Sequence, residues 1–140
     1  MCIKWKLTKE QQDSVLSGWK DSEDITLYKV VRRRVEDGRV VHRAICTGQE
    51  YIEGLNIIDE DVIVHRYNME DNYKIGIHLF RLKRDAEEVA DNQIKRDAYK
   101  DIVVDVTVKK EWITVIGETE HERKKYVMIV AQQAVFPEMK

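Results

Sequence analysis

The sequence predicts an α+β domain in which a mostly antiparallel sheet of about six or seven strands carries one main helix and a short N-terminal helix. Three observations indicate this class. An Asp-Gly pair at positions 37–38 joins two β-rich runs, an amphipathic segment follows Leu82, and the chain ends in three further β-rich runs. One proline and six scattered glycines leave no linker, so residues 1–140 are expected to form a single globular domain.

The first predicted element is a short surface helix over Lys9–Ser17. Thr8 is followed three residues later by Gln11, which is the spacing of a capping box, and Gly18 is a typical C-terminal stop. Few apolar side chains support this helix, and we expect it to pack by one edge only.

The second element is a β-hairpin formed by Ile25–Glu36 and Arg39–Cys46. Asp37-Gly38 supplies the two positive φ angles of a type I′ turn, and a two-residue turn sets the register. One face of the predicted ribbon carries Val31, Val35, Val40 and Ala44, with Arg33 and His42 between them. The other face carries Arg32, Arg34 and Arg43 together with Tyr28, Val30, Val41 and Ile45.

The remaining elements follow from hydrophobic periodicity. The main helix is expected from Leu82 to about Lys95, where apolar residues fall on one stripe. The expected strands cover Tyr51–Ile58, Asp61–Tyr67, Tyr73–Arg81, Ile102–Val108, Glu111–Gly117 and Lys124–Phe136. The last of these is apolar on both sides of the pleat, so we expect a central strand.

Composition narrows the classes of function. With 24 basic and 26 acidic side chains the net charge is −2, which argues against nucleic acid as a partner. No apolar run of membrane-span or signal-peptide length occurs, and only Cys2 and Cys46 are present. These features predict a cytoplasmic protein with reduced thiols and no membrane association.

The arginine side of the hairpin is the first candidate binding surface. Arg32 and Arg43 are predicted to lie opposite each other with Arg34 beside them, and Tyr28 on the same face adds contact area. Guanidinium groups in this arrangement suit a phosphate, a carboxylate or an acidic protein surface. The alternative is that neighbouring carboxylates of the same chain neutralise them. Arg33 and His42 on the apolar face either reach solvent near the ribbon's end or form a buried polar pair with a carboxylate.

Motifs of catalysis and metal binding are absent from the sequence. It contains no Gly-rich phosphate loop, no Gly-x-Ser-x-Gly and no paired Cys or His ligands at metal-binding spacing. We therefore predict no catalytic residues, no cofactor and no metal.

Three segments between residues 25 and 110 form a recognisable order: a Leu27-Tyr28-Lys29-Val30 strand, a Gly76-Ile77-His78-Leu79-Phe80 strand leading into a helix, and a Val-rich strand at 102–108. In this order the segment resembles a class of small uncharacterised phage and bacterial proteins. More distantly, the segment resembles the ADP-ribosyltransferase core. That resemblance places Lys29 where the family has His or Arg and His78 where it has an aromatic residue, while Glu118 and Glu120 lie in the region of the family's glutamate.

The sequence thus supports three hypotheses. The first is a non-enzymatic binding module, such as a phage or mobile-element accessory protein, that binds a host protein or a small anionic ligand. Its candidate residues are Arg32, Arg34, Arg43, Tyr28 and His78. The second is a divergent enzyme of ADP-ribosyltransferase-like fold that handles NAD or another nucleotide. The third is a structural protein that forms homo-oligomers through exposed strand edges.

Overall fold

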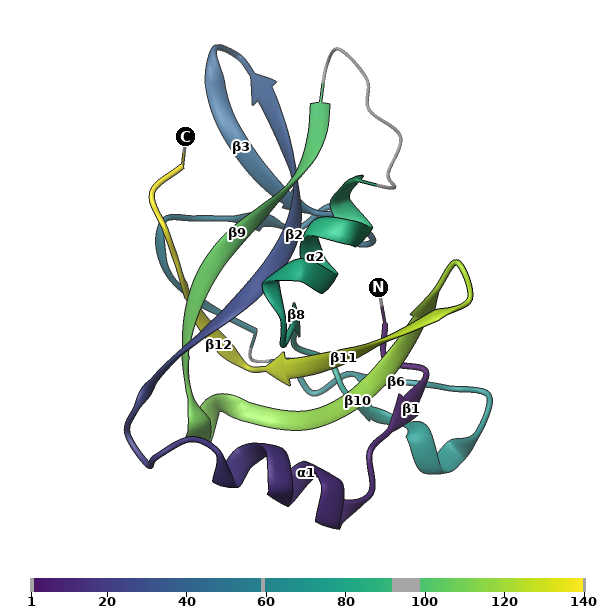
Figure 1. Ribbon diagram of the computed structural model, residues 1–140. Helices are drawn as coiled ribbons and strands as arrows, with labels where there is room; N and C mark the ends of the chain where they lie inside the picture. The colour runs from purple at the N-terminus through teal and green to yellow at the C-terminus, as the bar shows by residue number, and fades with distance from the viewer. Residues whose placement is uncertain (1, 59, 92–98, 140) are drawn as a thin grey trace.

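The computed structural model describes residues 2–58, 60–91 and 99–139, and these contain twelve strands and two α-helices (Figure 1). The helices are α1 (Lys9–Ser17) and α2 (Lys83–Asp91), with two single 3-10 turns, η1 (Met69–Asp71) and η2 (Lys110–Trp112). The strands are β1 (Trp5–Lys6), β2 (Asp24–Glu36), β3 (Arg39–Ala44), β4 (Glu50–Tyr51), β5 (Gly54–Ile57), β6 (Ile63–Val64), β7 (Tyr73–Lys74), β8 (Ile77–Phe80), β9 (Tyr99–Lys109), β10 (Ile113–His121), β11 (Lys124–Ala131) and β12 (Gln133–Phe136).

Ten of the described strands form one antiparallel sheet, and β6 and β7 form a separate pair. The strand order across the main sheet is β1-β10-β11-β8-β2-β9-β12-β5. Outside this order, β3 pairs with β2, and β4 pairs with β3. A single residue, Gln132, joins β11 to β12, although three strands separate these two in the sheet. Since one residue spans only a few ångströms, the sheet must curl until its two parts meet. In Figure 1, β10 and β11 accordingly run across the lower part of the view, transverse to the long β2–β9 pair.

The expected fold class is wrong in its strand number and in its single main helix. Six or seven strands were expected where the described residues form twelve, and the two α-helices have nine residues each. Several missed strands have only two to four residues, which is too short for a period-two pattern to be recognised. Residues 92–95 of the expected main helix lie outside the described residues.

The expected strand Lys124–Phe136 divides at Gln132, because the chain changes neighbours there. β11 pairs with β10 and β8, whereas β12 pairs with β9 and β5. The Gln132 backbone N–H donates to the Trp112 carbonyl at 2.9 Å, and its carbonyl accepts from the Ile58 N–H at 2.8 Å. Both halves are flanked by strands on each side, so the expected central position is confirmed for each.

The hairpin is confirmed, with the expected register from Val31 opposite Ala44 to the turn, but its second strand ends at Ala44 and not at Cys46, because the chain turns there. Asp37 and Gly38 have φ angles of 52° and 76°, and Glu36 lies opposite Arg39 while Arg32 lies opposite Arg43. The capping box of α1 is also present, with the Gln11 N–H donating to Thr8 Oγ1 at 3.2 Å and the Thr8 N–H donating to Gln11 Oε1 at 2.9 Å. These elements depend on neighbouring residues in the chain, which is why sequence reasoning could find them.

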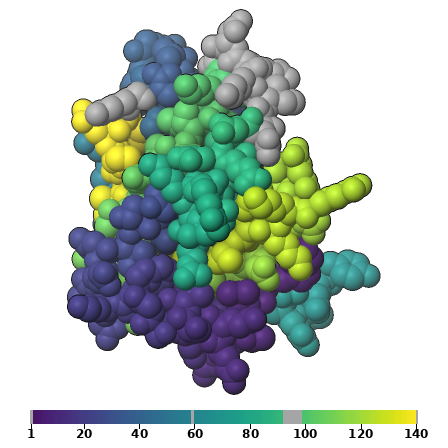
Figure 2. Space-filling view, viewed as in Figure 1, coloured from purple at the N-terminus to yellow at the C-terminus, as the bar shows by residue number. Residues whose placement is uncertain are grey.

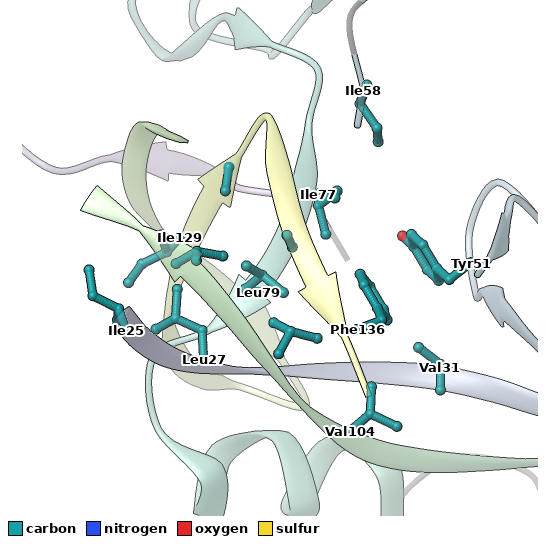
Figure 3. Close-up of a cluster of buried hydrophobic side chains, with 14 of the residues drawn as sticks. Ile25, Leu27, Val31, Tyr51, Ile58, Ile77, Leu79, Val104, Ile129 and Phe136 are labelled. Carbon is teal, nitrogen blue, oxygen red and sulfur yellow. The ribbon is translucent and has the colours of Figure 1, made fainter. Parts of the chain in front are cut away.

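The core has two parts because the curled sheet is covered on both faces. The larger part lies inside the curl and holds Ile25, Leu27, Val31, Ile77, Leu79, Val104, Ile129 and Phe136, among others (Figure 3). The Tyr51 ring stacks on that of Phe136, with centroids 4.4 Å apart. The smaller part lies beneath α2, whose Ala86, Val89 and Ala90 are buried.

The outer surface carries α2 and a projecting segment. Figure 2 shows α2 exposed at the centre of this view beside β11, and the segment that includes η1 protruding from the body. In residues 2–58, 60–91 and 99–139, neither helix has the length and apolarity needed to cross a membrane.

Candidate functional site: an apolar cavity around Lys29

A cavity of about 140 Å³ opens where the sheet is interrupted beside β2. One edge of β2 pairs with β8 only at Tyr28 and with β3 from Val31 onward. Lys29 and Val30 lie between the β2–β8 and β2–β3 pairings, where no described strand neighbours this edge of β2. Because successive side chains of a strand point to opposite faces, this gap in the sheet is lined from both faces. Its walls are mostly apolar and include Val30, Ile45, Tyr51, Ile58, Phe80, Val89 and Met128, with Cys2, Cys46 and His78 among the polar members.

Lys29 is the buried charge in this cavity. Along β2 it occupies the inward-facing row between Leu27 and Val31, and only 9% of the residue is exposed. Its Nζ donates to the His78 carbonyl at 2.9 Å and lies 5.8 Å from the centre of the Tyr51 ring. The ion pairs found among the described residues all involve other side chains.

Burial changes the acidity of the Lys29 ammonium. Desolvation disfavours the charged form and lowers the pKa of Lys29 from 10.5 to about 8. Most Lys29 side chains are therefore still charged at pH 7, in an apolar setting and with one hydrogen-bond acceptor. An ammonium group has three donors, so the described contacts leave room for a ligand.

His78 holds the cavity in shape. Its Nδ1 lies 3.1 Å from the Gly76 carbonyl and its Nε2 lies 2.7 Å from the Tyr73 hydroxyl. Because a carbonyl only accepts, Nδ1 carries the proton, and Nε2 accepts from Tyr73. The Tyr73 oxygen in turn accepts from the Ile3 N–H at 3.0 Å.

The ring of His78 is neutral over the physiological range. Burial, and then the charge of Lys29, lower the pKa of His78 to about 3. His78 therefore presents no positive charge to a ligand. Its backbone carbonyl accepts the hydrogen bond that positions Lys29, and its ring nitrogen Nε2 accepts the hydrogen bond that positions Tyr73.

The arginines of the hairpin are engaged by carboxylates of the same chain. Arg32 forms two hydrogen bonds to Asp101, at 3.0 and 3.4 Å, and Arg43 forms two to Glu36, at 3.1 and 2.8 Å. Arg34, the most exposed of the three, lies 3.9 Å from Glu36. Carboxylates of the same chain therefore neutralise Arg32 and Arg43, which was the alternative to anion binding. Because each guanidinium has its own carboxylate, the sheet tolerates Arg32 opposite Arg43.

The five sequence-predicted site residues lie in three separate places in the structure. His78 lines the cavity, while Arg32, Arg34 and Arg43 lie on the β2–β3 hairpin. Tyr28 is half-buried and packs against the core beneath α2. His42, on the opposite face of the hairpin, is buried opposite Tyr51 of β4, so it does not reach solvent at a protruding end.

Arg32→Ala should lower the free energy of unfolding by about 2 kcal/mol. Asp101 is 5% exposed, and the truncation would leave its carboxylate buried without the guanidinium that now binds it. Arg34→Ala is the matched control, because its distant contact with Glu36 on the surface contributes little. Urea unfolding of both variants tests this, and equal stabilities would contradict a structural role for the Arg32–Asp101 pair.

Sequence reasoning did not select Lys29 from the residue pattern, although a signal was present. A lysine alternating with Leu27 and Val31 along a predicted strand occupies a core-facing position, where an unpaired charge is unusual. Cys46 and Tyr51 could not be placed beside it, because their contact with β2 depends on how the chain returns after the hairpin.

Within the part of the chain that the structure describes, no three His, Cys, Asp or Glu side chains are grouped so that they could hold a metal ion. The chain matches no protein-family model, and no significant match was found among curated proteins or solved structures.

Proposed function

We propose that this protein is a non-enzymatic binding module for a small anionic molecule with an apolar body, held in the Lys29 cavity. The observation that carries the proposal is the buried Lys29 ammonium in an apolar cavity, where, among the described residues, the His78 carbonyl is the hydrogen-bond partner found for it. A buried charge without a counter-charge is costly, and a carboxylate or phosphate entering the cavity would relieve that cost. The apolar walls would bury the rest of the ligand.

The hydrogen bonds of His78 favour binding over proton-transfer catalysis. Both ring nitrogens are bonded within the protein, to Gly76 and Tyr73, and a general base needs an available nitrogen. We therefore assign His78 a positioning role. The ligand's charge is recognised by Lys29, and its size and shape by the surrounding side chains.

Hexanoate should stabilise the folded protein at pH 7, whereas hexanol of similar shape should not. A ligand at one hundred times its dissociation constant adds about 2.7 kcal/mol, which shifts the melting temperature by several degrees. Binding should weaken about thirtyfold between pH 7 and pH 9.5, because only charged Lys29 is competent and its pKa is about 8. Calorimetric titration at the two pH values measures this.

The matched variants are Lys29→Met, which should lose the response to hexanoate, and Lys9→Met on the exposed start of α1, which should keep it. Equal shifts with hexanol and hexanoate would contradict the proposal. NAD belongs in the same panel: a shift with NAD and none with hexanoate would favour a nucleotide-handling protein instead.

A further inference from the structure

We propose that Lys29 also captures small apolar aldehydes and ketones covalently, as a reversible imine. The inference rests on the proposed function insofar as both ligand classes would occupy the same cavity. The inference adds a second class of ligand. The charged form of the Lys29 amine would hold an anion, whereas its neutral form would react with a carbonyl compound.

The geometry around Nζ supports this reactivity. Nζ is fixed by one hydrogen bond to the His78 carbonyl and faces a cavity with mostly apolar walls. None of the carboxylates in the described ranges forms an ion pair that would hold its proton. An amine desolvated in an apolar pocket is a common form of activated lysine nucleophile.

The lowered pKa of Lys29 also supports imine formation. With a pKa of about 8, a fair fraction of Lys29 is neutral at pH 7.5, whereas an ordinary lysine is almost fully charged there. The neutral amine carries the lone pair that the reaction needs. Poor access of water also slows hydrolysis of the product.

The reaction balances without any oxidant or reductant. The Nζ lone pair attacks the carbonyl carbon while the electrons of the C=O double bond move to oxygen, which takes a proton as nitrogen loses one. The resulting carbinolamine eliminates its hydroxyl group, which leaves as water with a further proton from nitrogen. One C=N bond forms, and one molecule of water is released for each ligand bound.

Two thiols in the cavity wall shape the choice of probe. Cys2 and Cys46 could add to an aldehyde or to an activated double bond. Hexanal, a saturated aldehyde, avoids the second reaction, and cyanoborohydride reduces an imine to a stable amine without trapping a thiol adduct. Only a lysine or the N-terminal amine can therefore carry a hexyl group after reduction.

The experiment treats the full chain with hexanal and cyanoborohydride at pH 7.5 and maps the hexyl group by peptide mass spectrometry. Lys29 should be labelled at least about tenfold faster than exposed Lys9, and the fast adduct should be missing from Lys29→Met. Labelling of Lys29 no faster than Lys9 in the wild-type chain would overturn the inference, whatever the variant does.

Hexanoate separates this inference from the proposed function. A thermal shift with hexanoate but no fast labelling of Lys29 would overturn imine formation alone. Fast labelling without any shift from hexanoate would overturn anion binding and leave imine formation supported. Slower labelling in the presence of saturating hexanoate would support both, because the two ligands would then compete for one cavity.

Discussion

Lys29→Met should raise the free energy of unfolding at pH 7 by about 2 to 3 kcal/mol. Lowering the pKa of this group from 10.5 to about 8 means that folding disfavours its charged form, at about 1.4 kcal/mol for each pH unit. Methionine has a similar length and no charge, so it removes that cost. It also removes the hydrogen bond to His78, which offsets about 1 kcal/mol of the gain.

The stabilisation by Lys29→Met should depend on pH with a defined sign. Between pH 8 and 10.5 the unfolded chain keeps the Lys29 proton while the folded chain has lost it. The wild-type protein therefore gains stability relative to the variant as pH rises through this window, and the two stabilities become equal near pH 10, where the remaining cost of burying the charge matches the hydrogen bond that the variant lacks. Urea unfolding of both proteins from pH 7 to 10.5 measures the difference, in which titrating groups distant from Lys29 cancel; Cys2 and Cys46, which interact electrostatically with Lys29, are replaced by serine in both proteins.

Lys9→Met serves as the control here too, since Lys9 is exposed and its removal should change stability little at any pH. A constant difference between wild type and Lys29→Met across the window would show that Lys29 titrates as an ordinary lysine. That result would also remove the support that acidity lends to imine formation.

Gly117→Ala should lower the free energy of unfolding by about 3 kcal/mol. Gly117 lies in β10 opposite Lys6 of β1, and a Cβ atom there would fall inside van der Waals contact of Ile3 Cγ2 and the Trp5 carbonyl oxygen. Ile3 is fully buried, and the Trp5 oxygen belongs to the backbone, so neither can move without displacing the first strand. Overpacking of this kind costs about 1–3 kcal/mol and sometimes more.

The same substitution at Gly18 is the matched control. Gly18 follows α1 with a φ of −69°, where alanine is allowed, and its added Cβ would meet only the Val15 carbonyl at 3.3 Å. Gly18→Ala should change the free energy of unfolding by less than about 1 kcal/mol. Similar losses in the two variants, measured by thermal and urea unfolding, would mean that β1 is not packed against Gly117.

Local features of the fold could be predicted from the sequence because neighbouring residues determine them. The turn at Asp37-Gly38 requires two positive φ angles, and the Thr8–Gln11 capping box needs only one helical turn. The alternation of Ile102, Val104, Val106 and Val108 likewise predicts their burial, which the structure confirms for the three valines, while Ile102 is partly buried. Each of these rests on interactions within one element or across one tight turn.

The number and order of strands could not be predicted, because they depend on contacts between distant parts of the chain. β1 forms only because residues 5 and 6 meet β10, and β5 only because residues 54–57 meet β12. The continuous apolar run from 124 to 136 gives no sign of the change of partners at Gln132. Periodicity indicates which side of a strand is buried, but not which strand lies beside it.

For the candidate site, too, some features follow from the local sequence and others depend on tertiary contacts. The sequence by itself determined that Lys29 alternates with Leu27 and Val31, and that Arg32 lies opposite Arg43 once the turn forms. Only the tertiary structure decided that Asp101 and Glu36 would engage those arginines and that a break between β8 and β3 would leave a cavity at Lys29. Residues far apart in the chain make these contacts, and their energies depend on burial that no single segment of the sequence specifies.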